Sequence, residues 1–466
     1  MRPLADCSRS TRGLAYARLN FALSLIVVGL AVYFMVRRVE VRLVLLASGL
    51  VLGLLAGQPL LMFDTFTRAM VAGMVGPICA AMGFAAVVSA TGCDKHLVHL
   101  LLMPIRRVRM LMLPGGILVA YLVNMAVSSQ TSTAAAIGPV LVPLLLAAGF
   151  SKEVAGAALL LGASFGGDLL NPGAQDVVAI ASVANIPAAE LSARVIPASL
   201  AGAMVAALVF ALLNRRGNGL VGASGTNGEA SGNGGVLASA TELTAAHDEF
   251  RVDPSHALVP VVPIALLLLG YGGFPPLAFL IEPPEGEAWK PFAGALPIVR
   301  AMLIGVILAL IVARRDIQKL TKTMFTGIGE AYGTIISLTI TAQCFGAGVA
   351  AVGLSARLLE VARSLGFLAV LAGGFPWALA LLSGSGSGPI LTFAQTFLPS
   401  LGPGEDGVRL AALACFGGAF GRTMSPVAAV VVYCSGLVGV SPILLVKRLT
   451  PAIVAGAFVS FALASL

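Results

Sequence analysis

Two polar clusters interrupt long apolar stretches of this chain. They read Ser128-Ser129-Gln130-Thr131-Ser132-Thr133 and Ser383-Gly384-Ser385-Gly386-Ser387-Gly388. Glycine lets backbone N–H groups approach a ligand closely, and helix N-termini at such turns attract anions. Serine and glycine are also common packing residues between membrane helices. Packing explains one such cluster more easily than two. A binding role is therefore favoured, in which the hydroxyls and the free N–H groups bind a small anion.

A second pair of clusters combines helix-breaking residues with opposite charges. They read Gly167-Asp168-Leu169-Leu170-Asn171-Pro172 and Gly421-Arg422-Thr423-Met424-Ser425-Pro426. Proline in a helix interior costs about 3 kcal/mol. Gly167 with Pro172, and Gly421 with Pro426, therefore predict a broken helix in each cluster. Unwound turns free carbonyl groups for a cation and N–H groups for an anion.

Asp168 and Arg422 are the charged residues of these predicted breaks, and charges at the centre of a bilayer are rare and usually functional. The planar fork of Arg422 suits a carboxylate, because it can bind two oxygens at once. Asp168 suits a coupling cation, Na⁺ or H⁺. The alternative is that the two charges pair with each other. The residues expected to bind the substrate are Ser129, Thr131, Ser132, Thr133, Asn171, Ser383, Gly384, Ser385, Gly386, Ser387, Arg422, Thr423 and Ser425.

The clusters belong to two copies of one unit. Placing residue i over residue i + 254 aligns Gly167 with Gly421, Pro197 with Pro451 and Ser129 with Ser383, without a gap. Two copies of a broken membrane segment rich in Gly, Pro and Ser are the best sequence pointer to the binding site of a secondary transporter.

The composition sets the class of protein. The chain is 58% hydrophobic and only 11% charged, with a mean hydropathy of +0.97, whereas a soluble domain carries about 25% charged residues. It is therefore predicted to be a polytopic protein of the lipid bilayer. The net charge of +8 reflects basic cytoplasmic loops rather than a nucleic-acid partner. The six cysteines show neither disulfide nor metal spacing, so no metal and no cofactor are expected.

The chain divides into a tail (1–19), a first transmembrane repeat (20–213), a flexible Gly/Ser-rich cytoplasmic linker (214–255) and a second transmembrane repeat (256–466). A re-entrant hairpin adds no net crossing. Each repeat is then predicted to cross the membrane five times, which is an odd number. The second copy must then lie upside down. The expected fold is all-α, with two inverted-topology repeats that each contain a re-entrant hairpin and a broken transmembrane helix.

The motifs resemble one known family. They are Gly421-Arg422-Thr423-Met424-Ser425-Pro426-Val427, Ser441-Pro442, Val446-Lys447-Arg448, Ala126-Val127-Ser128-Ser129, Gly83-Phe84-Ala85-Ala86, the run 341–348 and Ser383-Gly384-Ser385-Gly386. From about residue 66 onward, apart from the linker, the chain is similar to the DcuC family of C4-dicarboxylate carriers, within the wider ion-transporter superfamily. The resemblance implies secondary transport of succinate, fumarate or malate across the inner membrane, by exchange or with cations. It also implies a midplane site formed by two hairpin tips and two broken helices.

Three alternatives stay open. Members of the superfamily move other small anions, and some exchange sodium for protons, so a carrier of another small carboxylate and a cation/proton antiporter using Asp168 are both considered. An enzyme, an intramembrane hydrolase with Ser385 or Ser387 as nucleophile, would need a nearby base. All four histidines fall in loops or at helix ends, so the chain is expected not to be an enzyme. A homodimer is one assembly that the sequence allows.

Overall fold

The computed structural model describes residues 22–35, 37, 39–105, 109–214, 251–286, 289, 294–314, 316–400 and 405–466. These residues form helices and turns, with no strand among them. Helices suit a chain in lipid because they satisfy their own backbone hydrogen bonds. The predicted tail, and the predicted linker between residues 215 and 250, lie outside the described residues. The described ends of the linker are helical: Asn214 ends α10 and Pro254 begins α12.

The first half contains a hairpin, α6–α7, followed by a helix that is broken between α8 and α9. Its helices are Ala22–Met35, α2 (Val41–Leu55), α3 (Leu61–Met70), α4 (Val75–Thr91), α5 (Cys93–Leu102), α6 (Arg109–Val127), α7 (Gln130–Ala147), α8 (Lys152–Ser164), the 3-10 turn η2 (Gly167–Leu170), α9 (Gln175–Ala184) and α10 (Ala188–Asn214).

The second half repeats this order, with hairpin α19–α20 and a helix broken between α21 and α22. Its helices are α12 (Pro254–Leu258), α13 (Val262–Tyr271), η4 (Pro275–Leu277), α14 (Ala278–Ile281), α15 (Leu296–Ala313), α16 (Ile317–Ala331), the π-helical turn η6 (Tyr332–Ile336), α17 (Ser337–Ala351), α18 (Leu354–Ser364), α19 (Leu368–Ser383), α20 (Ser387–Phe397), η7 (Leu398–Ser400), α21 (Glu405–Thr423), α22 (Ala429–Val438) and α23 (Pro442–Ser465).

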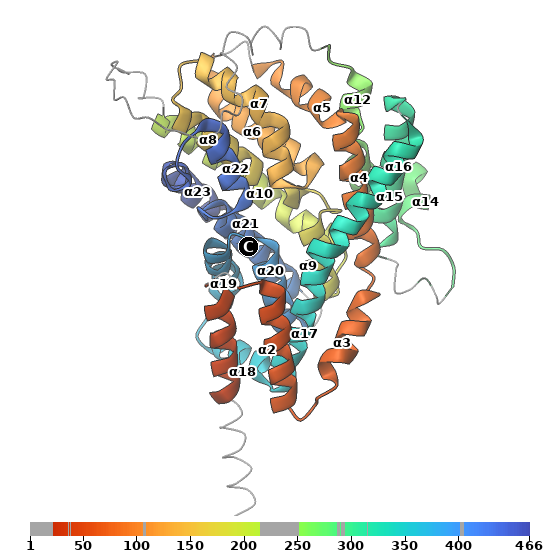
Figure 1. Ribbon diagram of the computed structural model, residues 1–466, viewed down its shortest axis with the longest axis vertical. Helices are drawn as coiled ribbons and strands as arrows, with labels where there is room; N and C mark the ends of the chain where they lie inside the picture. The colour runs from red at the N-terminus through yellow and green to blue at the C-terminus, as the bar shows by residue number, and fades with distance from the viewer. Residues whose placement is uncertain are drawn as a thin grey trace, which may run out of the picture.

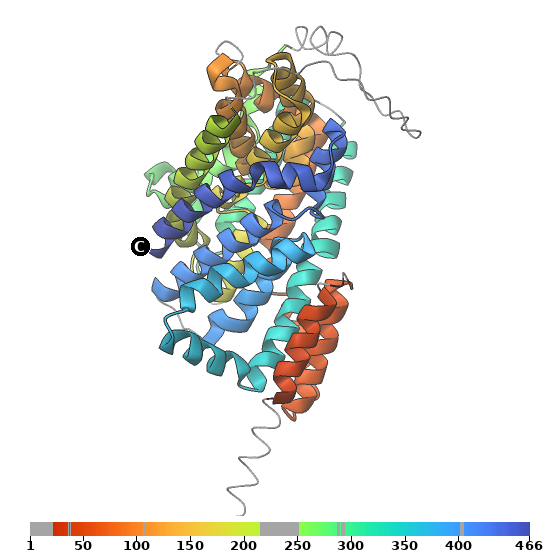
Figure 2. The ribbon, with the colours of Figure 1, turned by 90° about the vertical axis from the view of Figure 1, so that its left-hand side faces the viewer.

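The two repeats are inverted with respect to each other. Hairpin α6–α7 occupies the upper part of the molecule and hairpin α19–α20 the lower part, while both broken helices meet between them (Figure 1). The last helices of the repeats, α10 and α23, pack together and run antiparallel (Figure 2). Arg194 donates to the carbonyl of Ala464, and Ser460 donates to the carbonyl of Ala198. The residue number therefore rises along α10 while its partner's number falls along α23, as in an antiparallel pair.

Equivalent glycines meet where α10 and α23 cross. A Cβ atom at Gly202 would lie 2.8 Å from the carbonyl oxygen of Gly456, and one at Gly456 would lie 2.6 Å from the carbonyl oxygen of Gly202. The reciprocal contact is what a two-fold relation between the repeats requires. Small residues of this kind let membrane helices approach closely.

The structure corrects the gapless register of the repeat. The end of the broken helix keeps the predicted offset, since Ala174 and Ala428 precede α9 and α22 with matching backbone angles. The hairpins are shifted by two residues, because the positive-φ residue of the turn is Ser128 in the first and Gly384 in the second. Ser129 is therefore equivalent to Ser385, not to Ser383.

Six described helices are long and apolar enough to cross a membrane, or up to eight if each bent pair counts as one span. Helix α2 stops at Leu55. Gly57, at a φ of 72°, and Pro59 end the helix there, and α3 then joins α4 at a bend of 49°.

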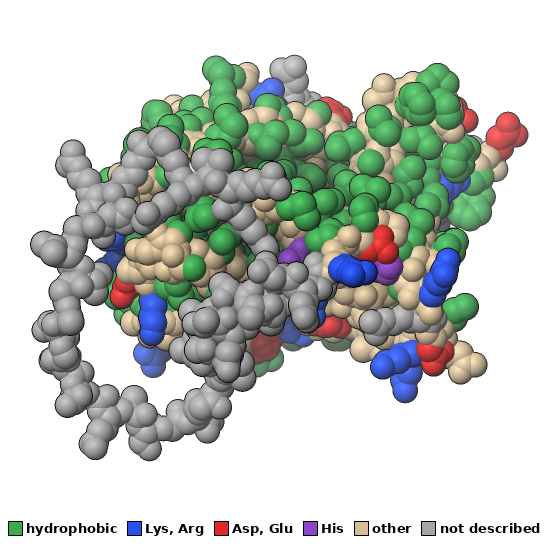
Figure 3. Space-filling model, turned by 90° about the horizontal axis from the view of Figure 1, so that it is seen from above, with side chains coloured by type: hydrophobic (Ala, Val, Ile, Leu, Met, Phe, Trp, Pro, Cys, Tyr) green, Lys and Arg blue, Asp and Glu red, His purple; other side chains and the backbone are tan. Residues whose placement is uncertain are grey.

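The surface of the molecule fits a bilayer. Large apolar side chains such as Phe458, Ile311 and Val370 are exposed on the outside of the helices, which is the contact a lipid phase accepts. Seen from the end where α5 and α12 lie, Lys and Arg side chains stand near the edge of the face (Figure 3). The linker that the sequence predicts to be cytoplasmic leads into α12, which lies at this end.

Candidate functional site

The first hairpin turns sharply at its tip. Ser128 adopts a φ of 54°, which is uncommon for a residue with a side chain, and Ser129 caps α7 by accepting a hydrogen bond from the N–H of Ser132 at 3.4 Å. The hydroxyls of Ser129 and Ser132 are 3.0 Å apart. Thr131 is half-buried. The tip therefore presents hydroxyl groups and the N-terminus of α7 toward the centre of the molecule.

The first broken helix is latched to this tip by Asn171. Its amide nitrogen donates to the carbonyl of Met125 at 3.2 Å and to the hydroxyl of Ser128 at 3.1 Å. Its amide oxygen accepts from the N–H of Gly173 at 2.9 Å. The side chain of Asn171 is therefore engaged in holding the break against the hairpin. A side chain at Gly167 would collide with the carbonyl of Tyr121, so the glycine is needed for this close approach.

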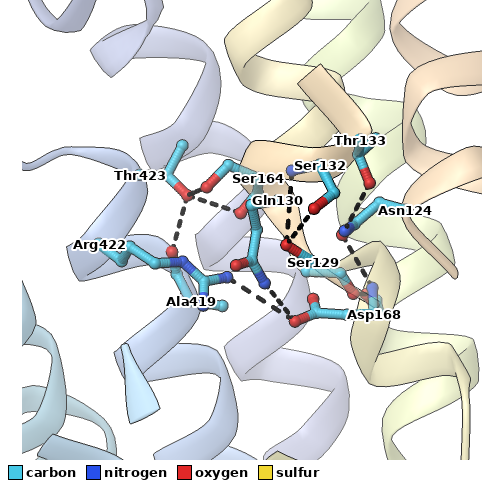
Figure 4. A network of polar contacts seen from close by, with 12 residues as sticks. Asn124, Ser129, Gln130, Ser132, Thr133, Ser164, Asp168, Ala419, Arg422 and Thr423 are labelled. Carbon is cyan, nitrogen blue, oxygen red and sulfur yellow. Dashed lines mark hydrogen bonds and ion pairs between the residues drawn. The ribbon is translucent and has the colours of Figure 1, made fainter. Parts of the chain in front are cut away.

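Asp168 lies at the centre of a polar network that joins the two halves (Figure 4). It is 3% exposed, and its Oδ2 accepts a hydrogen bond from the amide of Gln130 at 2.5 Å and lies 3.9 Å from Nη2 of Arg422. Its N–H donates to Asn124 at 2.9 Å, and Asn124 in turn donates to Thr133 at 3.3 Å. The network positions the carboxylate at the tip of the first hairpin and opposite the second broken helix.

Arg422 reaches this network from the last turn of α21. It is 7% exposed, and its Nε and Nη2 atoms are buried without a hydrogen-bond partner among the described residues. The second hairpin lies directly on its guanidinium, since a Cβ atom at Gly386 would be 2.7 Å from Nη1. A buried guanidinium with open donors is unusual, because burying an unsatisfied donor costs about 1–3 kcal/mol. Such donors suit an anionic ligand.

A second buried carboxylate, Asp176, completes the charged centre and was not predicted. It lies in the first turn of α9, is 3% exposed, and has the side chain of Ser387 beside its carboxylate. Arg422 is within electrostatic reach of both aspartates. The signal in the sequence is an acidic residue in an apolar helix, but the equivalent residue of the second repeat is Val430. A search for repeated polar residues therefore misses it.

The second broken helix differs from the prediction at its start. The predicted break includes Gly421, whereas α21 remains helical to Thr423 and the chain leaves the helix from Met424 onward. Gly421 serves helix packing instead, because a side chain there would collide with the carbonyl of Trp377 in α19. Pro426 lies in the break itself, as Pro172 does in the first repeat.

The two other predicted residues of this segment are both buried. The hydroxyl of Thr423 lies 2.6 Å from the carbonyl oxygen of Ser164 and 2.7 Å from that of Ala419, which ties α21 to α8 (Figure 4). Ser425 is fully buried, and its hydroxyl has no hydrogen-bond partner in the described structure. Thr423 therefore braces the crossing of the two helices, while the buried hydroxyl of Ser425 lacks a hydrogen-bond partner in the described structure.

The tip of the second hairpin is braced internally. Ser383 accepts a hydrogen bond from the N–H of Ser385 at 3.3 Å, and Ser385 accepts one from the N–H of Gly388 at 3.5 Å. Gly384 permits the turn with a φ of 76°, and a Cβ atom there would lie 3.0 Å from the backbone nitrogen of Ala428. The turn is thus packed against the second broken helix.

The two hairpin tips face cavities of very different size. A cavity of about 410 Å³ borders Ser129 and Ser132 of the first tip and is also lined by Asp94 and Glu330. A cavity of about 40 Å³ borders Ser383 and Ser385 of the second tip. Neither is lined by Asp168, Asp176 or Arg422. The charged centre is therefore enclosed, with more open space on the side of the first hairpin.

The structure thus brings Asp168, Gly386, Ser387 and Arg422 together with Gln130 and Asp176. Thr133, Asn171 and Thr423 lie around this centre in hydrogen bonds that hold its elements. Within the described part of the chain, no group of three or more His, Cys, Asp or Glu residues is arranged to hold a metal ion.

Comparison with known proteins identifies relatives. Residues 62–466 match the model of the DcuC family, described as C4-dicarboxylate anaerobic carriers. The anaerobic C4-dicarboxylate transporter DcuC of Escherichia coli is 25% identical over 387 residues, which cover 80% of this chain and 76% of the relative. An uncharacterized transporter of Haemophilus influenzae is 31% identical over 205 residues, or 44% of this chain and 70% of the relative. The crystal structure of the YdaH transporter of Alcanivorax borkumensis is 16% identical with a TM-score of 0.49, and the match covers 86% of each chain.

Proposed function

Because the chain belongs to the DcuC family of C4-dicarboxylate carriers, we propose that it carries succinate, fumarate or malate across the inner membrane. The transport is secondary, by exchange or coupled to cations. The observation that carries the proposal is Arg422, a buried guanidinium with two unpartnered nitrogens at the meeting point of the second hairpin and both broken helices. A carboxylate of the substrate supplies the oxygens that these nitrogens lack.

The hairpin tips bind the remainder of the substrate. Hydroxyls and N–H groups of Ser129, Thr131, Ser132 and Thr133 lie at the first tip, and those of Ser383, Gly384, Ser385, Gly386 and Ser387 lie at the second. Asn171, Thr423 and Ser425 border the breaks. A small dicarboxylate has its two charges a few ångströms apart, so one charge on Arg422 and one at a helix N-terminus is a favourable arrangement.

The inverted repeats supply the alternation of access. The open cavity lies at the first hairpin tip, and the second tip is closely packed. Exchanging the conformations of the two repeats would close the first side and open the second, with Arg422 remaining between them. Asp168 takes the role of the coupling-cation ligand, because its carboxylate contacts both the first hairpin and Arg422. A homodimer stays a prediction.

The test is exchange in proteoliposomes. Proteoliposomes that contain the purified protein and internal unlabelled fumarate are expected to accumulate labelled succinate from outside. Proteoliposomes without internal fumarate are not. Malate and fumarate should compete, whereas monocarboxylates of similar length should compete weakly. Absence of exchange with every C4-dicarboxylate, in correctly inserted protein, would exclude the proposed substrate class and favour a carrier of another small carboxylate.

A second candidate is a cation/proton antiporter. The observation in its favour is that the charged centre holds two carboxylates and one guanidinium, which leaves a net negative charge if both carboxylates are ionised. An antiporter would move sodium against protons without any dicarboxylate, which a vesicle-trapped pH dye measures directly. The hydrolase alternative is withdrawn, because the family and its relatives are transporters.

A further inference from the structure

Each hairpin tip contributes a polar side chain to one buried aspartate. Gln130 at the first tip donates a hydrogen bond to Asp168, and the side chain of Ser387 at the second tip lies beside the carboxylate of Asp176. In both aspartates the other carboxylate oxygen, Oδ1, is fully buried and has no hydrogen-bond partner among the described residues. Arg422 lies within electrostatic reach of both. The two carboxylates therefore have the same incomplete environment, within electrostatic reach of one guanidinium.

An ionised carboxylate with a buried, unpartnered oxygen is unfavourable, because burial removes its hydration without replacing it. A proton or a monovalent cation on that oxygen removes the deficit. The titratable or charged groups that face Asp176 from the elements around it are Arg422 and Cys415 of α21 and Asp168 of η2. The single positive charge of Arg422 cannot neutralise both aspartates.

A bound dicarboxylate makes this imbalance larger. With both aspartates ionised, the centre carries one net negative charge before binding, and two more negative charges arrive with the substrate. Like charges held a few ångströms apart in a poorly hydrated site repel strongly. If one cation binds at each aspartate, the loaded centre returns to the net charge of the empty one. Charge balance thus points to two cations per substrate.

We propose that Asp176 holds a second coupling cation beside the one at Asp168, so that two monovalent cations accompany each dicarboxylate. The proposal rests on the proposed function. The cations are protons or sodium ions, and each binds at Oδ1 of its aspartate. Asp168 contacts the first hairpin and Asp176 lies beside the second. The cation at Asp168 therefore acts on the first tip, and the cation at Asp176 acts on the second. Net uptake then carries no charge, since two cations offset the two charges of the substrate.

The test uses the dependence of net uptake on membrane potential. Proteoliposomes with wild-type protein receive a potential from a potassium gradient and valinomycin, and labelled succinate uptake is measured with a sodium gradient and, separately, with a proton gradient. The gradient that drives uptake identifies the cation. Wild-type uptake is expected to be the same at zero and at inside-negative potential. Asp176→Asn transports one cation fewer, so an inside-negative potential should slow its uptake several-fold.

Exchange of succinate for internal fumarate moves no net charge in any variant, and it shows in the same vesicles that the carrier is assembled. Asp64→Asn is the control, because it makes the same chemical change on α3, outside the charged centre and outside the cavities at the two hairpin tips. It should remain insensitive to potential. Ser387→Ala, which removes the hydroxyl beside Asp176, should raise the half-saturating concentration of the cation more than that of succinate.

Uptake by Asp176→Asn that stays independent of potential would overturn the second cation site, and so would a wild-type carrier whose net uptake is itself sensitive to potential. Absence of succinate exchange in the wild type would instead defeat the proposed function. The two failures are therefore distinguishable.

Discussion

Arg422 lies 3.9 Å from Asp168 across the boundary between the two repeats, and the two residues occupy the same position in the two copies of the unit. The distance is long for a charge-assisted hydrogen bond, and no hydrogen bond joins Nη2 of Arg422 to any described residue. The pair is thus close enough to hold both charges in a buried site, but open enough for a substrate carboxylate to take the place of Asp168. That exchange of partners is the basis of the predictions on this site.

Arg422→Ala should nearly abolish dicarboxylate transport, whereas Arg422→Lys should leave a weakened carrier. Lysine keeps the charge but loses the planar fork that binds two oxygens. Hydrogen bonds to a charged group contribute about 1.5–3 kcal/mol each, so the half-saturating concentration in the lysine variant should rise roughly 10- to 100-fold. Succinate exchange in proteoliposomes measures both. A normal affinity and rate in well-inserted Arg422→Ala would remove the centre of the mechanism.

Asp168→Asn should act on coupling more than on substrate affinity. Asparagine keeps the hydrogen-bonding shape but cannot bind a proton or attract a cation as a carboxylate does. Uptake by this variant should lose most of its dependence on pH or sodium, while the half-saturating concentration of succinate changes less. The measurement is succinate uptake over a range of pH and sodium. Poor expression of the variant with unchanged coupling would show instead that Asp168 only pairs with Arg422.

Gly386→Ala should weaken transport, because the added Cβ would lie 2.7 Å from Nη1 of Arg422 and move either the hairpin tip or the guanidinium. Overpacking of this kind costs about 1–3 kcal/mol, which corresponds to roughly a tenfold rise in half-saturating concentration. Gly388→Ala is the matched control on the same hairpin, since its nearest neighbour would be Leu338 at 3.6 Å, an ordinary contact. Equal effects of the two substitutions would contradict the proposed contact.

Much of this architecture could be predicted from the sequence, because helix breakers in apolar segments have few alternatives. The duplicated breaks and hairpins, and the opposite charges at Asp168 and Arg422, follow from residue types alone. The two-residue shift between the hairpins could not, since it depends on whether the chain turns at Ser128 or at Gly384. Asp176 was missed for another reason: it meets Ser387 across the fold, and alignment of the two repeats contains no information about such contacts.

Deleting most of the segment from Gly217 to Ala240 should leave transport nearly intact. This part of the predicted linker is rich in Gly, Ser and Asn and has few of the apolar residues that would offset the entropy of ordering it. The described helices on either side, α10 and α12, end outside the charged centre. Succinate exchange by the shortened protein, compared at equal amounts of inserted carrier, is the measurement. Loss of exchange despite normal insertion would assign the linker a role in transport.

The unequal cavities at the two hairpin tips predict which tip is accessible to a reagent in water. Ser132 is exposed beside the cavity of about 410 Å³, and Ser383 borders the cavity of about 40 Å³. In this conformation, a cysteine at residue 132 should react with a membrane-impermeant maleimide at least tenfold faster than one at residue 383. Four of the five described native cysteines are buried, so the background should be low.

The same pair of variants tests the alternation between conformations. If the repeats exchange their conformations, conditions that favour the opposite state should slow labelling at residue 132 and speed it at residue 383. The two changes must be reciprocal, because inverted repeats cannot open one side of the site without closing the other. Saturating succinate added to one side of oriented vesicles is the natural perturbation. Labelling that rises or falls at both tips together would show that the carrier does not alternate in this way.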